Sequence, residues 1–405
     1  MRVVVIGGGA SGFFTAINLA SLHPQHEVIL LEKTSKLLSK VKISGGGRCN
    51  VTHHCDSKQA LLEAYPRGKK FLRQVFHKFS TQDTIDWFQA RNVTLKVEAD
   101  GRMFPTDDRS QTIIDCFLRE AKKYKVVIQL RSEVMQLLPV ENRWRVILKN
   151  KPPLQADRVV VASGGSPQLK GLNWLAALGH HIVPPVPSLF TFNFVDKTLM
   201  QLQGVAVPKV KVSILKKKLV AEGALLITHW GLSGPAVLRL SAWGARQLYD
   251  TQYDFTVQIS WLNDYKEEAL VAFLHNSKHS LKQRQIGNKN PFQLPKRLWE
   301  YLIARIDLPF NKKWIDLSKK DMYRLVNVLL YDTYGVKGKT TFKEEFVTCG
   351  GIALEDVQVQ TMESKVAKGL YFTGEVLDID GITGGYNFQA AWATAFVAAQ
   401  ALGAT

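Results

Sequence analysis

The sequence predicts an α/β fold built on a parallel sheet, with a β-rich segment and a helical segment inserted into it. Three observations support this prediction. An apolar strand pattern at residues 2–6 runs into glycines and a helical pattern, and further glycine-rich turns follow strand patterns late in the chain. Between them the composition shifts from about residue 190. A chain of 405 residues, 46% of them hydrophobic, is long enough for several domains with sizeable cores.

Several protein classes are excluded at this stage. No stretch approaches the roughly 18 consecutive apolar residues that a membrane-spanning helix needs. The strand pattern begins at residue 2, which leaves no room for a signal peptide. The four cysteines form no CxxC pair, which argues against a disulfide framework and against a zinc site. We therefore expect a cytoplasmic protein that does not associate with membranes.

The first glycine cluster predicts a dinucleotide site. Gly7, Gly9 and Gly12 form a GxGxxG pattern between the strand at 2–6 and a helix over 13–22. Gly7 permits the tight turn, Gly9 lets the backbone approach a pyrophosphate, and Gly12 lets the helix pack close to the strand. Ala10 and Ser11 lie where the N-terminus of the helix would face the phosphates.

An acidic residue follows at the distance that this fold requires. A second strand over 27–31 ends in Glu32, twenty residues after Gly12, where a carboxylate would accept hydrogen bonds from a ribose hydroxyl. An acid here disfavours the extra phosphate of NADP and leaves FAD or NAD. Lys33 and Lys40 complete the candidates in this stretch. No second GxGxxG exists, so a nicotinamide would visit only transiently.

Two more glycine-rich segments are expected to contact the same cofactor. A loop of three glycines could wrap a pyrophosphate or a flavin edge with backbone N–H groups. A strand over 157–161 ends in a second turn of the same kind. The candidates in these segments are Gly45, Gly46, Gly47, Arg48, Cys49, Asn50, Ala162, Ser163 and Gly164.

The C-terminal region predicts the third such segment. A strand and turn over 369–375 precede a glycine-rich stretch and a helix over 388–402, rich in alanine and able to pack tightly on a sheet. The positive end of that helix would face the pyrimidine edge of a flavin, and Asp380 could accept from a ribityl hydroxyl. The candidates are Gly374, Glu375, Asp380, Gly381, Gly385, Tyr386, Asn387 and Phe388.

The charge is concentrated in the middle of the chain. The formal net charge is +18, and residues 201–340 hold 22 lysines and arginines against 11 acidic residues, whereas residues 341–405 hold 3 against 8. Such an excess favours binding of a polyanion, most often a nucleic acid, although a generally basic composition that keeps proteins of the source organism soluble would explain it too. Strands are expected over 205–212, 219–228 and 253–260, and helices over 264–283, 294–306 and 317–332.

Cations stand beside aromatic residues in this segment, at Phe292, Trp299, Trp314 and Tyr323. This arrangement suits phosphate contacts with base stacking, and it equally suits a solvated face whose aromatics belong to the core. His229 could donate a proton or stack on a substrate ring, or it could be structural. The surroundings of Ser233 contain no GxSxG pattern, which argues against a hydrolase.

Five ordered motifs resemble the YhiN/BaiN-like (aminoacetone-oxidase-like) FAD-dependent flavoproteins across nearly the whole chain. They span 44–50, 101–105, 228–235, 361–365 and 374–387. The resemblance implies a Rossmann-like two-dinucleotide FAD domain split between the termini, 1–190 and 341–405. It also implies an inserted β-barrel domain over 191–262 and a helical domain over 263–340. By analogy the backbone of Val134 would lie beside the adenine.

Members of that family are identified as amine oxidases, enone reductases or ribosomal RNA dihydrouridine synthases. The basic charge favours the last, in which a uridine of ribosomal RNA is reduced at C5–C6 with electrons from transient NADH or NADPH. Cys49 and His229 are then the candidate proton donors, and Arg48 would polarise a carbonyl. A small-molecule oxidoreductase and an RNA-binding protein without turnover remain alternatives. The free protein is expected to be a monomer.

Overall fold

The computed structural model describes residues 1–340 and 347–403. These residues form two compact units, one made of residues 1–188 and 347–403 and the other of residues 189–340, each with its own hydrophobic core. The expected second junction, at residue 341, falls in the stretch 341–346, which lies outside the described residues.

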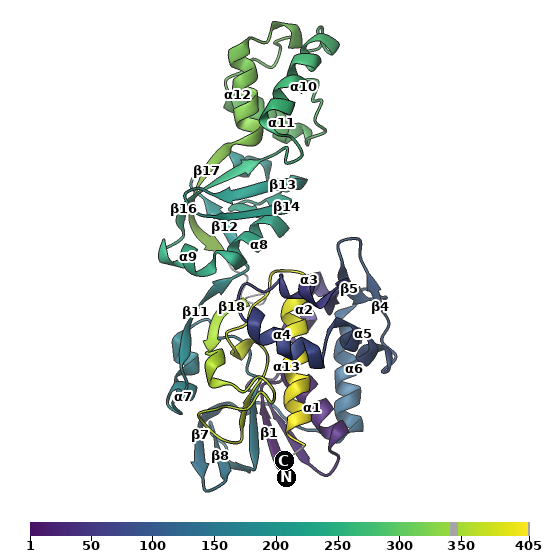
Figure 1. Cartoon of the computed structure of the whole chain (residues 1–405), viewed down its shortest axis with the longest axis vertical. Coiled ribbons are helices and arrows are strands. Elements are labelled where there is room, and N and C mark those ends of the chain that lie inside the picture. Colours follow the sequence, from purple (N-terminus) through teal and green to yellow (C-terminus); the bar gives the residue numbers. More distant parts are fainter. Residues whose placement is uncertain (341–346, 404–405) are drawn as a thin grey trace. The chain divides into compact units, whose positions relative to one another are not determined.

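The first unit is built on a five-stranded parallel sheet in the order β19-β10-β1-β2-β6 (Figure 1). Strands β1, β2, β10 and β19 are short apolar runs that are largely buried, as expected of a parallel sheet covered on both faces, whereas the edge strand β6 is partly exposed. Their bounds are β1 Arg2–Ile6, β2 Glu27–Leu31, β6 Val127–Gln129, β10 Arg158–Val161 and β19 Leu370–Phe372.

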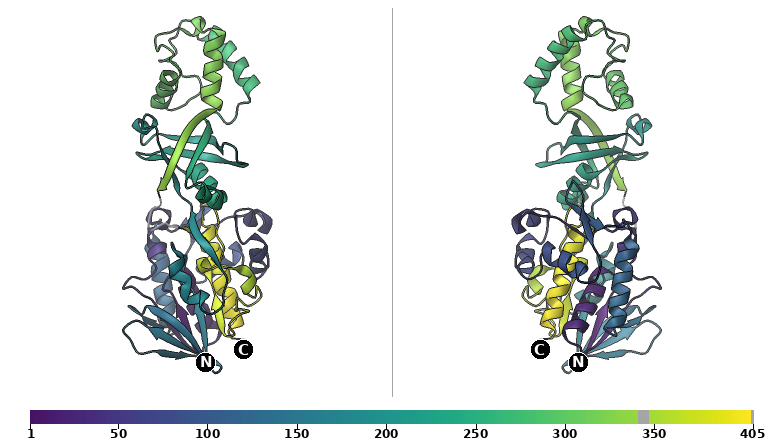
Figure 2. Two further views of the ribbon diagram at one scale, coloured as in Figure 1. Left: turned by 90° about the vertical axis from the view of Figure 1, so that its left-hand side faces the viewer. Right: turned by 90° about the vertical axis from the view of Figure 1, so that its right-hand side faces the viewer.

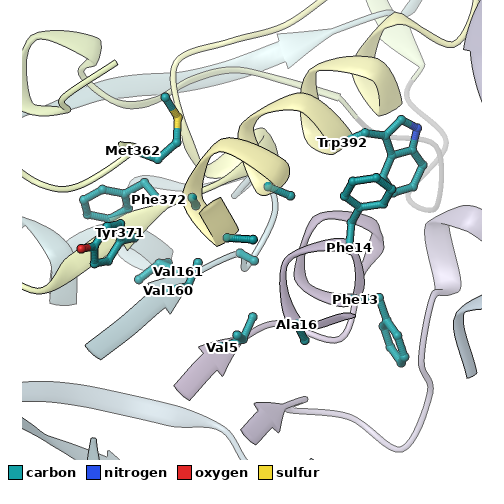
Figure 3. Close-up of a cluster of buried hydrophobic side chains, with 14 of the residues drawn as sticks. Val5, Phe13, Phe14, Ala16, Val160, Val161, Met362, Tyr371, Phe372 and Trp392 are labelled. Carbon is teal, nitrogen blue, oxygen red and sulfur yellow. The ribbon is translucent and has the colours of Figure 1, made fainter. Parts of the chain in front are cut away.

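Two helices from opposite ends of the chain pack side by side on this sheet. Helix α1 (Ala10–Leu22) lies along α13 (Tyr386–Ala401), and the rings of Phe14 and Trp392 are 5.2 Å apart (Figure 3). The alanines of α13 are buried, which lets the backbones approach closely. Helix α6 (Ser110–Lys123) packs against the other side of α1. The split domain is therefore held together by core packing.

Smaller elements surround the sheet. Strands β3, β5 and β4 form an antiparallel sheet, and they lie between α2 and α6 in the sequence. A second antiparallel sheet, of β7, β8 and β9, contacts β1 and β10. Strand β11 pairs with β18. The bounds are α2 Ser39–Gly47, β3 Thr52–His53, α3 Lys58–Leu62, α4 Lys69–Lys78, α5 Thr81–Gln89, β4 Leu95–Val97, β5 Arg102–Pro105, β7 Val134–Val140, β8 Arg143–Leu148, β9 Leu154–Ala156, α7 Asn173–Ala176, β11 Ile182–Ser188 and β18 Val347–Ile352.

The second unit contains a closed six-stranded barrel in the order β12-β15-β14-β13-β16-β17. Its strands include all three that the sequence predicted in this segment, with ends shifted by one or two residues. The bounds are β12 Thr191–Phe194, β13 Ala206–Ile214, β14 Leu219–Ile227, β15 Gly231–Ser233, β16 Asp254–Ser260 and β17 Asp332–Thr340, with helices α8 Pro235–Trp243 and α9 Ala245–Asp250.

Three helices, α10 (Glu267–Ser280), α11 (Lys296–Arg305) and α12 (Lys319–Leu330), form a bundle that is joined to the barrel (Figure 2). The buried carboxylate of Asp332 accepts hydrogen bonds from Trp261 (3.0 Å), Tyr334 (2.5 Å) and Arg305 of α11 (2.9 Å). The predicted helix over 317–332 is two residues too long at each end, because Ser318 caps the start of α12 and Asp332 opens strand β17.

The predicted fold class is confirmed: a discontinuous Rossmann-type domain is interrupted by a β-barrel and a group of helices. Within the part of the chain that the structure describes, none of the helices combines the length and apolar character that crossing a bilayer requires.

Candidate dinucleotide site

The three glycines of the first motif differ in what surrounds them. Gly7 has a φ of +118°, and a Cβ there would lie 2.3 Å from the carbonyl oxygen of Ala162. A Cβ on Gly12 would lie 1.9 Å from the carbonyl oxygen of Gly7. A Cβ on Gly9 would meet no atom within 4 Å. Gly7 and Gly12 therefore serve the turn and the packing, whereas Gly9 borders open space at the start of α1.

The N-terminus of α1 is suited to an anion. Gly9 is its N-cap, and no side chain caps the first turn, so the helix offers backbone N–H groups and a positive dipole end. The hydroxyl of Ser11 donates to Thr373, just after β19, over 2.8 Å. Ala10 is half-buried beside it. The turn is therefore fixed from the neighbouring C-terminal strand.

Glu32 closes the end of β2 beside this turn. Its carboxylate accepts from the backbone N–H groups of Gly8 (2.9 Å) and Thr34 (2.8 Å). The N–H of Ser132 donates to the carbonyl of Glu32 over 2.8 Å, which places the segment leading into Val134 and β7 beside the acid. Lys33 is exposed. Glu32, the predicted ribose contact, and Val134, the predicted adenine contact, therefore lie near each other in the fold.

The second glycine cluster lies at the C-terminal end of α2 rather than in a simple loop. The helix breaks at Ser44, and Gly45, Gly46 and Gly47 follow with φ values of +60°, +70° and +85°. Glycine adopts this left-handed backbone without strain. Gly46 and Gly47 border open space, whereas a Cβ on Gly45 would lie 2.9 Å from the ring of Phe104.

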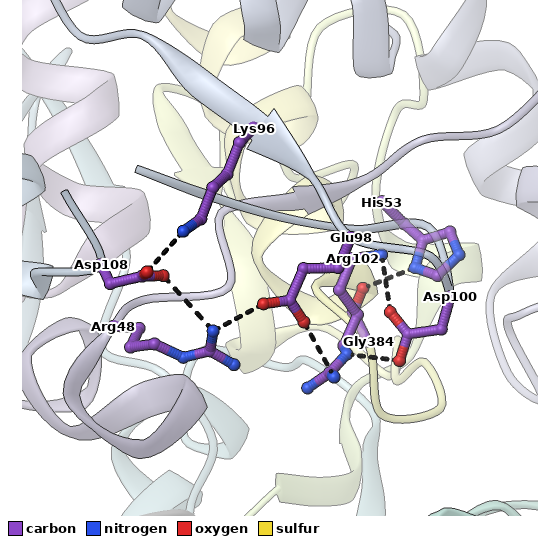
Figure 4. Close-up of polar contacts among 8 residues, drawn as sticks. All are labelled: Arg48, His53, Lys96, Glu98, Asp100, Arg102, Asp108 and Gly384. Atoms are coloured by element: carbon purple, nitrogen blue, oxygen red, sulfur yellow. Dashed lines mark hydrogen bonds and ion pairs between the residues drawn. The ribbon is translucent and has the colours of Figure 1, made fainter. Parts of the chain in front are cut away.

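Arg48 is held by a group of charged side chains (Figure 4). Its Nη1 donates to Glu98 (2.6 Å) and Asp108 (3.3 Å), and the guanidinium lies 3.9 Å from the centre of the Phe104 ring. Glu98 also binds Arg102 over 3.0 Å. The two carboxylates share the charge of Arg48 and fix its direction. Whether it polarises a carbonyl stays a prediction.

Cys49 does not fit the role that the sequence suggested. Its side chain is 0% exposed, and burial raises the pKa of the thiol to about 12. The left-handed backbone at this residue, with φ +61°, directs its N–H to the carbonyl of Ser44. The thiol therefore stays protonated inside the core. This burial does not favour Cys49 as a proton donor or as a cofactor contact, and both roles stay predictions.

The N-terminus of α13 is a second uncapped helix end. Gly385 is its N-cap with a φ of +92°. The side-chain amide of Asn50 is oriented so that both its nitrogen and its oxygen form hydrogen bonds, and its oxygen then accepts from the N–H of Gly385 over 3.0 Å. The side chain of Asn387 exchanges two hydrogen bonds with the backbone of Gly381 (2.8 and 3.0 Å). These bonds connect the second glycine cluster to the C-terminal turn.

The neighbouring rings make that turn rigid. Tyr386 stacks on His53, with ring centres 4.6 Å apart, and His53 Nδ1 lies 3.0 Å from the carbonyl oxygen of Gly384 (Figure 4). Phe388 stacks on Trp392, 5.4 Å away. The helix end is therefore held in place by packing on both sides.

The turn after β19 joins the remaining predicted residues. Gly374 has a φ of +73°, and a Cβ there would lie 2.7 Å from the Cβ of Ser11. The carboxylate of Glu375 accepts from Lys40 (2.8 Å) and from the N–H of Thr348 (2.9 Å). Ala162 is buried behind the turn, while Ser163 is exposed and Gly164 borders open space.

Asp380 is engaged elsewhere. Its side chain is 0% exposed, and its carboxylate accepts from Arg67 through two nitrogens and from the hydroxyl of Ser188 (2.7 Å). These bonds hold the carboxylate in the core and do not favour the expected bond to a ribityl hydroxyl, which stays a prediction. Arg67 lies 313 residues away in sequence, and no local pattern announces the pair.

His229 belongs to the second unit, in the bend between β14 and β15. It is exposed, and its ring lies edge-on to Trp230 at 4.1 Å between centres. Its proposed role as a proton donor stays a prediction.

The residues of the first unit fit a bound FAD. Uncapped helix ends at Gly9 and Gly385 offer two positive poles, and Gly9, Gly46 and Gly164 leave space that a side chain would fill. Glu32 supplies the acid at the ribose position. The hydrogen bonds described above connect these segments to one another, although they come from both ends of the chain.

Comparisons with known proteins agree with this fit. The HI0933-like protein Rossmann domain family matches residues 1–401. A ribosomal RNA dihydrouridine synthase of Escherichia coli K12 is 32% identical, covering 98% of this chain and 97% of the relative. A 3-dehydro-bile acid delta(4,6)-reductase of Clostridium scindens is 29% identical, covering 99% of this chain and 98% of the relative.

Among solved structures, 3-ketosteroid delta1-dehydrogenase of Sterolibacterium denitrificans superposes with a TM-score of 0.52 at 13% identity and covers 99% of both chains. At that identity the likeness concerns the fold alone. Fold, glycine framework and family agree, and the chain belongs to the HI0933-like family of FAD-dependent oxidoreductases.

Proposed function

We propose that this protein reduces a uridine of ribosomal RNA to dihydrouridine, using FAD and electrons from NADH or NADPH. The observation that carries the proposal is the distribution of charge. Residues 201–340, almost all of the second unit, contain twice as many basic as acidic residues, 22 against 11. The E. coli relative named as a ribosomal RNA dihydrouridine synthase supports the same substrate class.

The charge distribution discriminates between substrates. An RNA substrate is bound largely through its phosphates, which requires a surface of lysine and arginine. A small amine cation would be repelled by such a surface, and a neutral small molecule would gain nothing from it. The C-terminal residues 341–405, which complete the FAD domain, carry 3 basic and 8 acidic residues. Residues 1–200 carry 28 basic and 16 acidic residues, so the ratio of basic to acidic residues is highest in the inserted unit, although the excess is not confined to it.

The protein's own groups can be assigned to the bound cofactor as follows. The N-terminus of α1 beside Gly9 would hold the pyrophosphate, and Glu32 would bind the ribose. The N-terminus of α13 would stabilise negative charge on the flavin ring. When bound, FAD would supply the two-electron chemistry that reduction of the uracil C5–C6 bond needs, with the accompanying proton coming from a side chain or from water.

Two candidates remain for the polar chemistry of the substrate. Arg48, fixed by Glu98 and Asp108, would polarise a uracil carbonyl. His229 is exposed and therefore able to exchange a proton with a substrate, unlike the buried Cys49. The uracil has to leave its stack to present its face to the cofactor.

A second candidate function is reduction of a small conjugated enone. The 29% identity to the Clostridium scindens bile acid reductase over nearly the whole length favours it. The two candidates share the FAD domain and differ in whether the basic unit takes part.

Both candidates are tested in one experiment with purified flavin-loaded protein. Ribosomal RNA from cells lacking the gene, or a bile acid enone, is added with NADH or NADPH. We expect dihydrouridine in the RNA, measured by mass spectrometry of nucleosides, with a rate that falls as salt increases. Enone reduction at a salt-independent rate, with unmodified RNA, would favour the second candidate. RNA binding without reduction of either substrate would contradict both.

A further inference from the structure

The helical bundle has one end remote from the barrel. The C-terminus of helix α12 continues directly into barrel strand β17. The helix has 12 residues and is therefore about 18 Å long, so its first residue, Lys319, lies at the end remote from the barrel. Helix α10 follows barrel strand β16 and ends at Ser280. It packs against α12 and against the one-turn helix at 314–316, which precedes α12 in the chain, so Ser280 lies at the same far end.

Two loop segments are paired at this end. The N–H of Ile286 donates to the carbonyl of Lys312 (2.9 Å), and the N–H of Trp314 donates to the carbonyl of Arg284 (3.0 Å). Gln285 and Lys313 face each other in this short antiparallel bridge. The segments 282–287 and 310–315 are therefore held together through their backbones.

This end is strongly positive. Residues 278–289 and 310–324 contain nine lysines and arginines against two aspartates. One of the aspartates, Asp321, is buried, accepts from Lys312 (2.7 Å) and caps α12, so its charge is already compensated. Among the described residues no carboxylate forms an ion pair with the exposed cations, which are Lys282, Arg284, Lys289, Lys313, Lys319 and Lys320. We call these six residues the distal basic surface.

Two exposed aromatic rings lie in the segments that carry these cations, Phe310 (45% exposed) and Tyr323. Trp299 and Trp314 are 1% and 0% exposed, so of the two interpretations that the sequence left open, these rings follow the one that places them in the core. Tyr323 is 59% exposed. It follows Lys319 by four residues and Lys320 by three, which places all three on one face of α12. This side of α12 therefore offers a free ring next to two free charges.

We infer that the distal basic surface binds the sugar–phosphate backbone of RNA, and that Tyr323 stacks on an unpaired base beside it. The inference rests on the proposed function and assigns its RNA contact to a particular part of the fold. Lysine and arginine beside an exposed aromatic ring match phosphates next to splayed bases. An anionic membrane is a poorer match, because a helix that lies on a bilayer needs an exposed apolar face.

The charges are tested by a triple variant and a matched control. Lys313→Ala/Lys319→Ala/Lys320→Ala removes three charges from the distal basic surface, and Lys211→Ala/Lys217→Ala/Lys218→Ala removes three exposed charges from the barrel. Binding of the flavin-loaded protein to a labelled RNA hairpin with a uridine-rich loop is measured by fluorescence anisotropy over a salt series. We expect the first variant to weaken binding by about tenfold or more and to lower the salt slope by about 2.

The ring is tested by Tyr323→Ala. We expect this variant to bind the looped hairpin about fivefold more weakly, because one stacked base is lost, and to bind a blunt RNA duplex like the unaltered protein. Retained flavin content and melting temperature show that each variant is folded.

Three outcomes would overturn the inference: equal losses in the distal and barrel variants, no loss in the distal variant, or binding to phosphatidylserine vesicles in place of RNA. The proposed function fails separately. If the distal variant loses RNA affinity but the unaltered protein forms no dihydrouridine, the surface assignment stands and the uridine reduction is wrong.

Discussion

Gly9 and Gly12 show how differently two residues of one motif are constrained. A methyl group on Gly12 would lie 1.9 Å from the carbonyl oxygen of Gly7, whereas a methyl group on Gly9 would meet open space. We therefore expect Gly12→Ala to destabilise the protein by about 1–3 kcal/mol through overpacking. Gly9→Ala should leave the melting temperature of the flavin-free protein unchanged and lower its flavin content. Equal melting temperatures for the two variants would contradict this assignment.

Cys49 yields a prediction opposite to the one that its motif suggests. The thiol is buried and its pKa is raised to about 12 by burial, so it is neither accessible nor ionised near neutral pH. Cys49→Ser should retain bound flavin and most of the turnover, with a loss confined to stability. Turnover is measured per bound flavin. A loss of more than about tenfold in this quantity would restore Cys49 as a proton donor.

Individual residues could be predicted from the sequence where the backbone imposes their role. Gly7 and Gly12 are fixed by local geometry, since strand, turn and helix follow one another within a dozen residues. The burial of Asp380 and Cys49 could not be predicted, because their environment depends on the tertiary fold. Arg67 reaches Asp380 from 313 positions away, and the direction of the Cys49 side chain depends on a left-handed backbone.

At the scale of elements, apolar runs with clear ends were predicted well. The parallel strands β1, β2, β10 and β19 and the barrel strands β13, β14 and β16 match because each run is bounded by turn residues, whereas β6 was not predicted. Ends that depend on tertiary contacts were missed. Asp332 was placed in a helix, but its buried bonds to Trp261 and Arg305 make it the first residue of β17.

Helix α12 gives a prediction about acid stability. Burial by itself would raise the pKa of Asp321, but hydrogen bonds from Lys312 and Ser318 outweigh it and lower the pKa from 3.8 to about 2. A pKa lowered by folding contributes stability that is present above the unfolded value and is lost as the pH falls through the folded value. Asp321→Asn should therefore cost roughly 2 kcal/mol at neutral pH, and the difference should shrink between pH 4 and pH 2.

This effect is measured by urea unfolding followed by tryptophan fluorescence, with Asp316→Asn as the control. Asp316 is exposed and forms no ion pair with another described residue, so its substitution should leave the unfolding free energy unchanged. A pH-independent difference for Asp321→Asn would contradict the assignment of the stabilisation to its carboxylate.

At the scale of the whole molecule, the discontinuous architecture could be predicted because both ends of the chain carry flavin-type glycine turns and the middle does not. The packing of α1 along α13 explains how the split domain is held together. The substrate could not be predicted from that framework, because the same FAD domain serves relatives named for RNA and for bile acids.

The most direct test of uridine reduction maps dihydrouridine in ribosomal RNA from cells with and without this gene. We predict that deletion removes the modification at one site, that the unaltered gene restores it, and that a Gly9→Ala gene restores less or none. An identical dihydrouridine map in the two strains would contradict the assignment of ribosomal RNA as the substrate.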